Sequence, residues 1–380
     1  MKHLLFVDDE PRILEGLQRS LWGLRHEWAA RFVTSGEQAI AALQESLCEI
    51  LIVDMRMPFM DGAELLRQVQ KEHPSVIRLI LSGQSDQESA YRAVGYAHQY
   101  LSKPCEPANL KATFKRLHHL CTLCDTESVR SVLTGLRGLP TQPQVYQEVC
   151  TALREGSSPK AIGSIMAHDP GMTSRILQLV NSSFFGPRHT INSVELAAEY
   201  LGIEVIKVLM ESLDHCSRAT HGEDADVAHE RLWKHSLAVA TLAKAIAQDL
   251  HFSPALIDAA FAAGLLHDVG MLLLGMEPEA APHSAEQESV VNSHAGMGAY
   301  LLGLWGLSDP IVEAVAYHHE PHRCIQRGLS PLTAVHLAEA LLSASSPGEN
   351  PVKLLRRDDA YVEALGLTQQ VKQWERNFPI

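Results

Sequence analysis

The first third of the sequence holds a set of side chains that could carry phosphoryl chemistry. Asp8 and Asp9 end the apolar segment HLLFVDD, Asp54 ends EILIVD, Ser82 ends IRLILS, and Lys103 follows HQYLS. Carboxylates that meet in one crevice repel one another unless they share a cation, and carboxylate oxygens with water suit Mg²⁺. A phosphoryl group on a carboxylate would need a lysine cation and a hydroxyl donor beside it. The set predicts a magnesium site with Asp54 as phosphoryl acceptor, although each residue alone would be an ordinary loop residue.

A second set of candidate ligands lies in the second half of the chain. Histidine and acidic residues recur there on or beside apolar segments: His235, His267, Asp268, His294, His318, His319 and Glu339. Imidazole with carboxylate suits Zn, Fe or Mn, and helix bundles build such sites from inward-facing side chains of different helices. A lone histidine is usually a core or surface residue, so this candidate metal site depends on convergence that the sequence does not display.

The elements that must position the first set alternate between strand and helix. Near-continuous apolar runs span 3–9, 28–35, 49–55, 77–83 and 98–104. Segments with helical spacing of apolar residues span 13–21, 36–46, 62–72, 88–96 and 108–120. This alternation predicts a doubly wound, flavodoxin-like α/β domain over residues 1–120, with five parallel strands and helices on both faces. Working residues gather at the carboxyl ends of such strands, which is where the first set falls.

The segments VDDE, VDMRMPFMDG, LSG and YLSKP resemble the receiver domain of two-component response regulators, and the resemblance covers the whole of residues 1–120. It implies phosphorylation of Asp54. It also implies Mg²⁺ held by Asp9, Asp54 and the carbonyl of Arg56, with Asp8 acting through water. A histidine kinase is the phosphodonor that the family implies.

The same resemblance implies a set of switch residues. Ser82 takes the place of the hydroxyl that moves toward the phosphoryl group, and Tyr100 that of the aromatic whose rotation accompanies phosphorylation. Lys103 precedes Pro104 as the family's lysine precedes its commonly cis proline. Because no key position departs from the pattern, we expect a receiver that can be phosphorylated.

Beyond the receiver, apolar residues continue at heptad spacing at Leu110, Phe114, Leu117, Cys121 and Cys124. Two interpretations remain open. The seam is either the buried face of the receiver's last helix, or a signalling helix or dimer contact that continues into a helical linker over residues 121–138.

Residues 139–345 show helical periodicity without an alternating strand pattern, which predicts an all-α helical bundle. Ser158 and Asp169 precede Pro159 and Pro170, an arrangement typical of helix starts. His168-Asp169 is therefore interpreted as capping and not as a metal-binding pair. Residues 346–380 are expected to form a helical extension that packs on the bundle.

The bundle has two layers of resemblance. LPTQPQVYQEV, IMAHDPGMTSRILQLVNSSFFG and SVELAAEYLG resemble the amino half of an HDOD domain, the HD-related output domain of bacterial signalling proteins. HSLAVATLAKAIA, GLLHDVG, HAGMGAYLLGLWGL and YHHE are similar to the metal-binding core of HD phosphohydrolases. HDOD domains have mostly lost that metal chemistry, whereas this chain keeps the ligand types.

Two departures from the HD pattern count against catalysis. Met271 stands where the pattern carries a lysine, and Glu339 stands where it closes with an aspartate. YHHE also leads into PHRCIQRGLSP, without the GYP stretch of cyclic-dinucleotide phosphodiesterases. A diester hydrolase needs a metal-bound hydroxide and cationic help for the leaving group, and only the first is offered.

Composition argues against several classes. The net charge is −13 and no Lys/Arg cluster forms a basic stripe, so nucleic-acid binding is not expected. We also expect no membrane span, since no apolar run reaches the ~18 residues of a membrane helix. The start MKHLLFVDDE lacks the segments of a signal peptide, so a cytoplasmic location is expected.

We therefore predict a response regulator in which phosphorylation of Asp54 switches an HDOD domain that signals by binding another, unidentified protein. The alternative is a receiver-gated, metal-dependent HD phosphohydrolase acting on a substrate such as a cyclic dinucleotide. A third interpretation lies between them, with a metal held structurally or as a sensor and no turnover. A homodimer is left open.

Overall fold

The amino-terminal part of the chain folds around a parallel sheet. The computed structural model describes residues 2–83, 93–124, 127–217, 223–274, 287–325, 328–345 and 357–377. Its strands are β1 (Lys2–Val7), β2 (Trp28–Val33), β3 (Ile50–Asp54), β4 (Ile77–Ser82) and β5 (Gln99–Ser102). They pair in parallel in the order β2-β1-β3-β4-β5. The predicted five-stranded sheet is confirmed, and the carboxyl ends of its strands share one edge.

Helices connect and cover these strands. They are α1 (Pro11–Leu21), with the short 3-10 helix η1 (Trp22–Leu24) after it, α2 (Gly36–Glu45), α3 (Gly62–Glu72) and α5 (Pro107–Leu120). All residues of β3 and β4 are buried, as expected for central strands covered on both faces. The helix predicted over 88–96 falls partly on residues 84–92, which lie outside the described residues. The doubly wound α/β prediction is confirmed.

The heptad seam ends where α5 ends. Leu110, Phe114 and Leu117 are buried on α5, whose last residue is Leu120, and Cys121 is its C-cap. The chain then turns, and Arg130 of the next helix, α6 (Glu127–Gly135), donates to the carbonyls of Cys121 and Cys124. The seam is therefore the buried face of α5. The interpretation as a helix that continues through these positions was wrong, because the chain turns back after Leu120.

From α6 onward the described chain is helical. The bundle consists of α7 (Pro143–Arg154), α8 (Pro159–Met166), α9 (Pro170–Val180), α10 (Val194–Leu201), α11 (Ile203–Ser217), α12 (Glu223–Asp249), α13 (Pro254–Leu266), α14 (Val269–Leu274), α15 (Gln287–Leu304), α16 (Asp309–Tyr317) and α17 (Pro331–Ser345), with the short 3-10 helix η2 (Pro321–Arg323). Ser158 caps α8 and Asp169 caps α9, as predicted. The all-α prediction holds for the described part of this region.

One expectation about apolar runs was wrong. The stretch Pro254–Leu273, which covers α13 and most of α14, is 20 residues long and apolar enough to cross a membrane by length and composition. Most of it is buried inside the fold, where α13 packs against α12, α16 and α17. Burial of this kind is typical of the core helix of a bundle.

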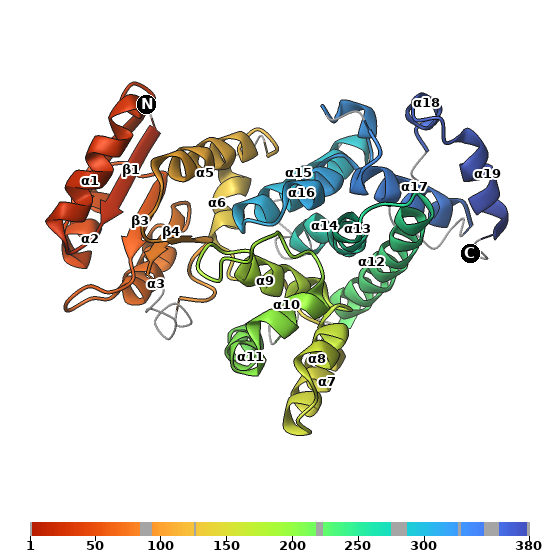
Figure 1. Ribbon diagram of the computed structural model, residues 1–380, viewed down its shortest axis with the longest axis horizontal. Helices are drawn as coiled ribbons and strands as arrows, with labels where there is room; N and C mark the ends of the chain where they lie inside the picture. Colours follow the sequence, from red (N-terminus) through yellow and green to blue (C-terminus); the bar gives the residue numbers. More distant parts are fainter. Residues whose placement is uncertain are drawn as a thin grey trace.

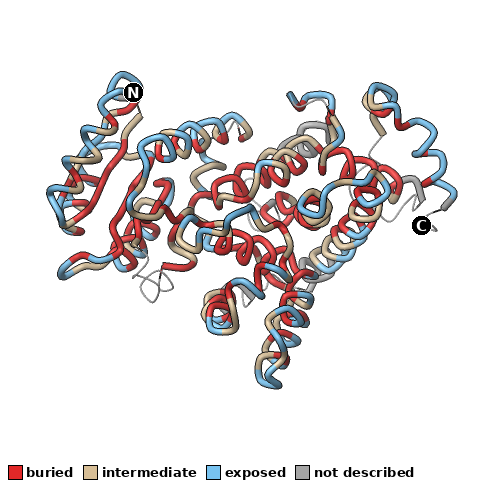
Figure 2. Tube along the Cα trace, viewed as in Figure 1, coloured by how far each residue is buried: buried red, intermediate tan, exposed pale blue. Residues whose placement is uncertain are grey.

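Figure 1 shows the α/β part at one end of the molecule and the last helices, α18 (Asp359–Ala364) and α19 (Thr368–Asn377), at the other. α5 and α6 both contact α15, so the two parts of the chain meet along that helix. The buried chain in Figure 2 runs through the strands and continues into α9, α13 and α15. Trp374 of α19 donates to Asp249 of α12 at 2.9 Å, so the carboxyl-terminal helices pack on the bundle.

Candidate functional site

The first set of predicted residues meets at the carboxyl edge of the sheet. Asp8 follows β1, Asp54 ends β3, and Lys103 comes directly after β5. Lys103 Nζ lies 2.7 Å from Asp8 Oδ2 and also forms an ion pair with Asp54 Oδ1. Strands far apart in sequence thus bring the lysine between two carboxylates, of which Asp8 is 1% exposed and Asp54 is 6% exposed.

Backbone groups fix the orientation of both carboxylates. The Arg56 N–H donates to Asp54 Oδ2 at 3.0 Å, and the Glu10 N–H donates to Asp8 Oδ1 at 3.0 Å. α3 starts so close to the end of β3 that a Cβ at Gly62 would lie 2.5 Å from the carbonyl oxygen of Asp54. This close approach explains why the segment MDG needs glycine there.

Burial and the ion pair act in opposite directions on these groups. Burial raises the pKa of Asp54 and outweighs the lowering by Lys103. Burial alone would lower the pKa of Lys103, but its bonds to Asp54 and Asp8 raise the pKa above the ordinary lysine value. The lysine therefore stays charged at neutral pH. Its ammonium group lies where a phosphoryl group on Asp54 would add negative charge, and it would neutralise part of that charge.

The remaining residues of this set differ in their burial and in their hydrogen bonds. Asp9 is half-buried beside Asp8, and Ser82 is buried and donates to the Gly83 carbonyl at 3.2 Å. Tyr100 is buried on β5, where burial raises the pKa of its phenol, and its hydroxyl has no hydrogen-bond partner within the described part of the chain. The Lys103-Pro104 peptide is cis.

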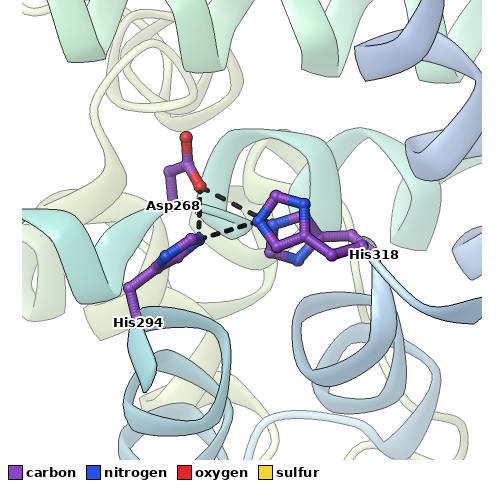
Figure 3. A group of neighbouring side chains, drawn as sticks. Asp268, His294 and His318 are labelled. Carbon is purple, nitrogen blue, oxygen red and sulfur yellow. Dashed lines mark hydrogen bonds and ion pairs between the residues drawn. The ribbon is translucent and has the colours of Figure 1, made fainter. Parts of the chain in front are cut away.

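The second set comes from five different helices or their ends. His235 lies on α12, His294 on α15 and Glu339 on α17, while His267-Asp268 follows α13 and His318-His319 follows α16. The structure brings all of them together around Asp268. His267 Nε2 lies 3.2 Å from Asp268 Oδ2. His294 Nε2 lies 3.0 Å from Asp268 Oδ1, and Figure 3 shows these two side chains pointing toward each other.

The other members of this cluster complete a continuous group. His318 Nε2 lies 3.7 Å from Asp268 Oδ1 and 4.0 Å from Glu339 Oε2, and His235 Nε2 lies 4.0 Å from Asp268 Oδ2. His319 Nε2 lies 3.2 Å from His294 Nε2. Asp268 belongs to two overlapping ligand groups, one with His235 and His267 and one with His294, His318 and His319.

Hydrogen bonds on the outer side of two rings determine which nitrogen faces the cluster. His267 Nδ1 lies 2.7 Å from the Gly264 carbonyl, and His318 Nδ1 lies 2.8 Å from the Val315 carbonyl. A carbonyl only accepts, so each Nδ1 carries a hydrogen and a neutral ring turns its Nε2 lone pair inward. Metal-binding histidines are oriented in this way.

Several inward-facing atoms are left without hydrogen bonds. Within the described ranges, His318 Nε2 and Glu339 Oε2 are buried without a hydrogen-bond partner, and His267 Nε2 faces the carboxylate of Asp268 at 3.2 Å. Buried polar atoms normally have partners, and each exception requires an explanation. Lone pairs from imidazole and carboxylate that converge without donors fit a divalent cation of the Zn, Fe or Mn class.

The charges of the cluster support this interpretation. Burial opposes charge on His267, but the carboxylate of Asp268 raises its pKa to about 9. Burial would raise the pKa of Asp268, yet its histidine neighbours hold it well below the ordinary value. Burial lowers the pKa of both His318 and His235 to about 4. A proton on His267 thus balances Asp268, and a cation bound by the neutral rings would replace that proton.

The motif HDVG has a backbone role beside its chemistry. A Cβ at Gly270 would collide with the backbone carbonyl of His294, so α14 passes α15 at a distance that only glycine allows. This crossing places Asp268 and His294 beside each other. The glycine of the motif therefore helps to assemble the cluster.

Sequence reasoning missed His336 on α17. Its Nδ1 donates to the His318 carbonyl at 2.7 Å, and its Nε2 accepts from the Asp358 N–H at 3.0 Å. It thus holds the backbone of a candidate ligand from behind. The signal was present, because His336 precedes Glu339 by three residues and so lies on the same face of the helix.

Solvent has little access to the cluster through its own side chains. His267, His294 and His318 are fully buried, and the side chains of Asp268 and Glu339 are each 5% exposed. The His235 side chain is 20% exposed and is the main contact of the cluster with the surface, along with the half-buried His319. The arrangement suits a held ion better than a bulky substrate.

Known proteins match the two parts of the chain separately. The family model of the response regulator receiver domain matches residues 4–115, and the model of the HDOD domain matches residues 139–321. The hydrogenase transcriptional regulatory protein HoxA of Cupriavidus necator is 33% identical over 115 residues, which are 30% of this chain and 23% of that protein. An uncharacterized protein of Treponema pallidum is 23% identical over 263 residues, 65% of this chain and 49% of that protein.

Two solved structures are also similar. The MmoQ response regulator of Methylococcus capsulatus has a TM-score of 0.45 and 24% identity, covering 63% of this chain and 98% of that chain. The signal receiver domain of an HD domain-containing protein of Pseudomonas fluorescens has a TM-score of 0.29 and 29% identity, covering 30% of this chain and 85% of that chain. The chain spans 23% to 49% of the length of the first curated relatives that it matches.

The two family models agree with the fold and with the two clusters of side chains. The first covers the sheet with Asp8, Asp54 and Lys103, and the second begins after α6 and includes Asp268. The chain therefore contains a response regulator receiver domain over residues 4–115, followed by an HDOD domain over residues 139–321.

Proposed function

We propose that the protein is switched by transfer of a phosphoryl group to Asp54. The observation that carries this proposal is the placement of Lys103 Nζ between Asp54 and Asp8 at the carboxyl edge of the sheet. Mg²⁺, when bound, would neutralise charge on the carboxylates and the incoming phosphoryl oxygens. Asp8, Asp9 and Asp54 with the Arg56 carbonyl would hold it.

The residues of the crevice have separate roles in the transfer. An oxygen of Asp54 attacks phosphorus, and the bond from phosphorus to the imidazole nitrogen of a phosphohistidine donor breaks. Lys103 Nζ stays beside the reacting oxygens and balances their charge. The buried hydroxyl of Ser82 donates to the Gly83 carbonyl at 3.2 Å, a long bond that it can exchange for one to a phosphoryl oxygen.

The HDOD domain serves as an output module that binds another protein. The cluster around Asp268 supports this, because His267, His294 and His318 are fully buried and therefore suit a held ion better than a bulky substrate. We further propose that the cluster holds Zn, Fe or Mn as a structural or sensing ion. His267, His318 and Glu339 form one possible ligand group for it, and Asp268 with His294, His318 and His319 forms another.

A metal-dependent phosphohydrolase is the second candidate function. The inward-facing Nε2 atoms of His267 and His318 favour it, because the resemblance to HD phosphohydrolases implies metal ligands at these two residues. Met271 in the place of a lysine counts against it, since the leaving group of a diester would lack cationic help. We therefore rank regulation above hydrolysis.

Metal analysis of the purified full chain tests the cluster. We expect bound Zn, Fe or Mn after chelator-free purification, and its loss from the variant His267→Ala/Asp268→Ala. The matched control is His168→Ala, which changes the histidine of an HD doublet that caps a helix. Equal metal content in the wild type and the double variant would contradict the metal assignment.

Phosphorylation is tested separately. With Mg²⁺ and a small acyl phosphate, the wild type should take up one phosphoryl group and Asp54→Asn should take up none. Asp61→Asn is the matched control, since Asp61 caps α3 in the same loop. Labelling of Asp54→Asn at the wild-type level would overturn the assignment of the acceptor.

A further inference from the structure

Helix α15 carries the candidate metal ligand His294 in its first half and contacts the receiver domain at its carboxyl end. His294 lies in its first half and Leu304 is its last residue. The ten residue steps from His294 to Leu304 span about 15 Å at the helical rise. Any shift of α15 along its axis therefore moves His294 and the receiver contact together.

The receiver binds the carboxyl end of α15 through side chains. Gln99 Nε2 donates to the Leu304 carbonyl at 2.9 Å and to the Gly303 carbonyl at 3.3 Å. Arg116 donates to the carbonyls of Gly303 and Leu307 and pairs with Asp309 at 2.9 Å. The last carbonyls of a helix lack partners within the helix, so the receiver supplies donors that α15 needs.

The middle of α15 is held as well. Tyr300 OH lies 3.0 Å from Thr134 Oγ1 on α6. A Cβ at Gly296 would collide with the Leu123 carbonyl, and one at Gly303 would collide with the Leu120 side chain. α15 thus lies directly against the end of α5 and the chain that follows it, with little room to move independently.

The other end of α15 determines the geometry of the cluster. His294 Nε2 lies 3.0 Å from Asp268 Oδ1, and the backbone of His294 lies against Gly270. In the docked arrangement the ligand atoms of Asp268, His294, His318 and His319 all lie within 4.8 Å of one another. Docking of the receiver therefore holds His294 in a position ready for a metal.

Strand β5 connects this contact to the phosphoacceptor. Gln99 begins β5, and Lys103, which pairs with Asp54, follows its last residue. Ser183 of the HDOD domain fixes the strand between them, because its hydroxyl contacts the Tyr100 carbonyl at 2.5 Å and accepts from the Ser102 N–H at 2.9 Å. A displacement of Lys103 is thus passed along a short, fixed strand.

We propose that α15 couples the chemical state of Asp54 to the metal affinity of the cluster around Asp268. The proposal rests on the phosphoacceptor and the metal site proposed above. When the receiver is docked on α15, His294 lies in a position suited to bind a metal. Loss of the Gln99 contact should therefore weaken metal binding. Because linkage is reciprocal, a phosphoryl analogue at Asp54 and a metal at Asp268 change each other's affinity by the same factor.

The test measures the Zn²⁺ affinity of the full chain by competition with a chromogenic chelator. The wild type, Gln99→Ala and Gln178→Ala are compared with and without beryllium fluoride and Mg²⁺, and His267→Ala/Asp268→Ala gives the background. Gln178 is the matched control, since its amide holds the same receiver segment from α9, through the His98 carbonyl at 2.8 Å, whereas the Gln99 amide binds carbonyls of α15. Circular dichroism checks that each variant is folded.

We expect beryllium fluoride to change the Zn²⁺ affinity of the wild type at least about fivefold, the lower end of typical coupling between sites. The change should persist in Gln178→Ala and fall below about twofold in Gln99→Ala, which should also bind Zn²⁺ more weakly. Zn²⁺ should shift beryllium fluoride affinity by the same factor.

Two results would overturn the coupling alone, with the metal site intact. One is an unchanged response in Gln99→Ala, and the other is an equal loss in both glutamine variants, which would assign the effect to docking in general. Zn²⁺ binding by the wild type no stronger than the background would instead refute the metal site and the coupling together. Unchanged phosphorylation of Asp54 in that case would leave the regulatory proposal standing.

Discussion

At the scale of single residues, the orientation of two imidazole rings gives the cluster around Asp268 its chemistry. His267 and His318 each give their Nδ1 hydrogen to a backbone carbonyl of their own helix, Gly264 and Val315. Among the described residues, this leaves His318 Nε2 without a hydrogen-bond partner, while His267 Nε2 faces the carboxylate of Asp268 at 3.2 Å. A purely structural histidine would normally use both nitrogens, so the orientation favours ion binding.

Glu339 offers a test that separates metal binding from folding. Its side chain is buried and burial raises its pKa, so the carboxylate opposes folding when no cation is present. We expect Glu339→Gln to raise the melting temperature of the chelator-treated protein and to lower its Zn²⁺ affinity about tenfold or more. Calorimetry and chelator competition measure the two effects.

The control for this variant is Glu320→Gln, whose side chain is 36% exposed and pairs with Arg323 outside the cluster. It should change neither quantity appreciably. A lower melting temperature of metal-free Glu339→Gln would show that the carboxylate stabilises the fold by itself, contrary to its role as a ligand.

His98 provides a prediction for pH. The Arg78 N–H donates to His98 Nδ1 at 2.9 Å, so the ring hydrogen is on Nε2, which donates to the Thr134 carbonyl at 2.9 Å. Burial, and then the Arg78 guanidinium, hold the pKa of His98 well below 6.5. Below pH 6.5 the unfolded chain takes up a proton that the folded chain refuses, so the free energy of unfolding falls as pH falls.

Replacing His98 by Asn keeps an acceptor for the Arg78 N–H and removes this titration. Between pH 6.5 and 5.5 the wild type should lose up to ~1 kcal/mol more stability than His98→Asn, as expected for one proton. Urea denaturation at both pH values measures the difference. The exposed His26→Asn serves as control, and equal pH slopes for wild type and His98→Asn would contradict the argument.

Residue types predicted which side chains could act, but not how they meet. The acids and the lysine of the receiver were placed correctly because each follows a strand of one parallel sheet, and strand ends share an edge. The convergence of His235, His294 and Glu339 depends on how helices cross, which no local pattern encodes. His336 was missed because its role is to hold a backbone carbonyl.

At the scale of elements, two N-cap residues that look alike in the sequence should contribute differently to stability, because one is buried and the other is exposed. Asp169 is fully buried, and its carboxylate accepts from the Met172 N–H at 2.7 Å and from the Gln142 N–H at 2.6 Å. Ser158 caps α8 with one bond, to the Ala161 N–H at 3.2 Å, near the surface. Asp169 therefore joins α9 to the start of α7.

We expect Asp169→Ala to lower the free energy of unfolding by about 3 kcal/mol, because a buried N–H and a partly buried N–H lose their charged acceptor. Ser158→Ala, the matched control, should cost about 1 kcal/mol, as typical of an exposed cap. Urea denaturation measures both. Equal losses would show that burial of the cap does not matter here.

Element positions were largely predictable, and the failures have local causes. Strands and helices of the receiver follow from apolar spacing, which is a property of short segments. The heptad seam failed as a signalling helix because Leu110, Phe114 and Leu117 pack inward and the chain turns after Leu120. The apolar stretch Pro254–Leu273 was overlooked because His267 and Asp268 interrupt it, although it forms the centre of the bundle.

At the scale of the whole molecule, polar contacts between distant parts of the chain hold the receiver against the HDOD domain. Arg116 of α5 binds Asp309 and the Gly303 and Leu307 carbonyls, and Gln178 of α9 binds the His98 carbonyl. The partners are separated by about 80 to 190 residues. Sequence patterns do not reveal such pairs. Arginine and glutamine are common surface residues, and every residue carries a backbone carbonyl, so the residue type does not indicate which carbonyl accepts.

Arg116 tests whether this contact stabilises the molecule. The guanidinium of Arg116 binds one carboxylate and donates to the carbonyls of Gly303 and Leu307. Without Arg116, the Gly303 carbonyl would still accept from Gln99, whereas the Leu307 carbonyl would lose its arginine donor. We expect Arg116→Ala to lower the free energy of unfolding by about 2 kcal/mol, the range for hydrogen bonds to a charged group. Urea denaturation of the full chain provides the measurement.

The matched control is Arg31→Ala, which removes an exposed pair with Glu45 within the receiver and should cost no more than about 1 kcal/mol. If the docked state regulates the cluster, Arg116→Ala should also weaken Zn²⁺ binding, because Arg116 holds the same end of α15 as Gln99. Loss of stability without loss of affinity would mean that Arg116 only joins the domains. Loss of both stability and Zn²⁺ affinity in Arg116→Ala, but not in Arg31→Ala, would mean that α15 connects receiver docking to the metal affinity of the cluster.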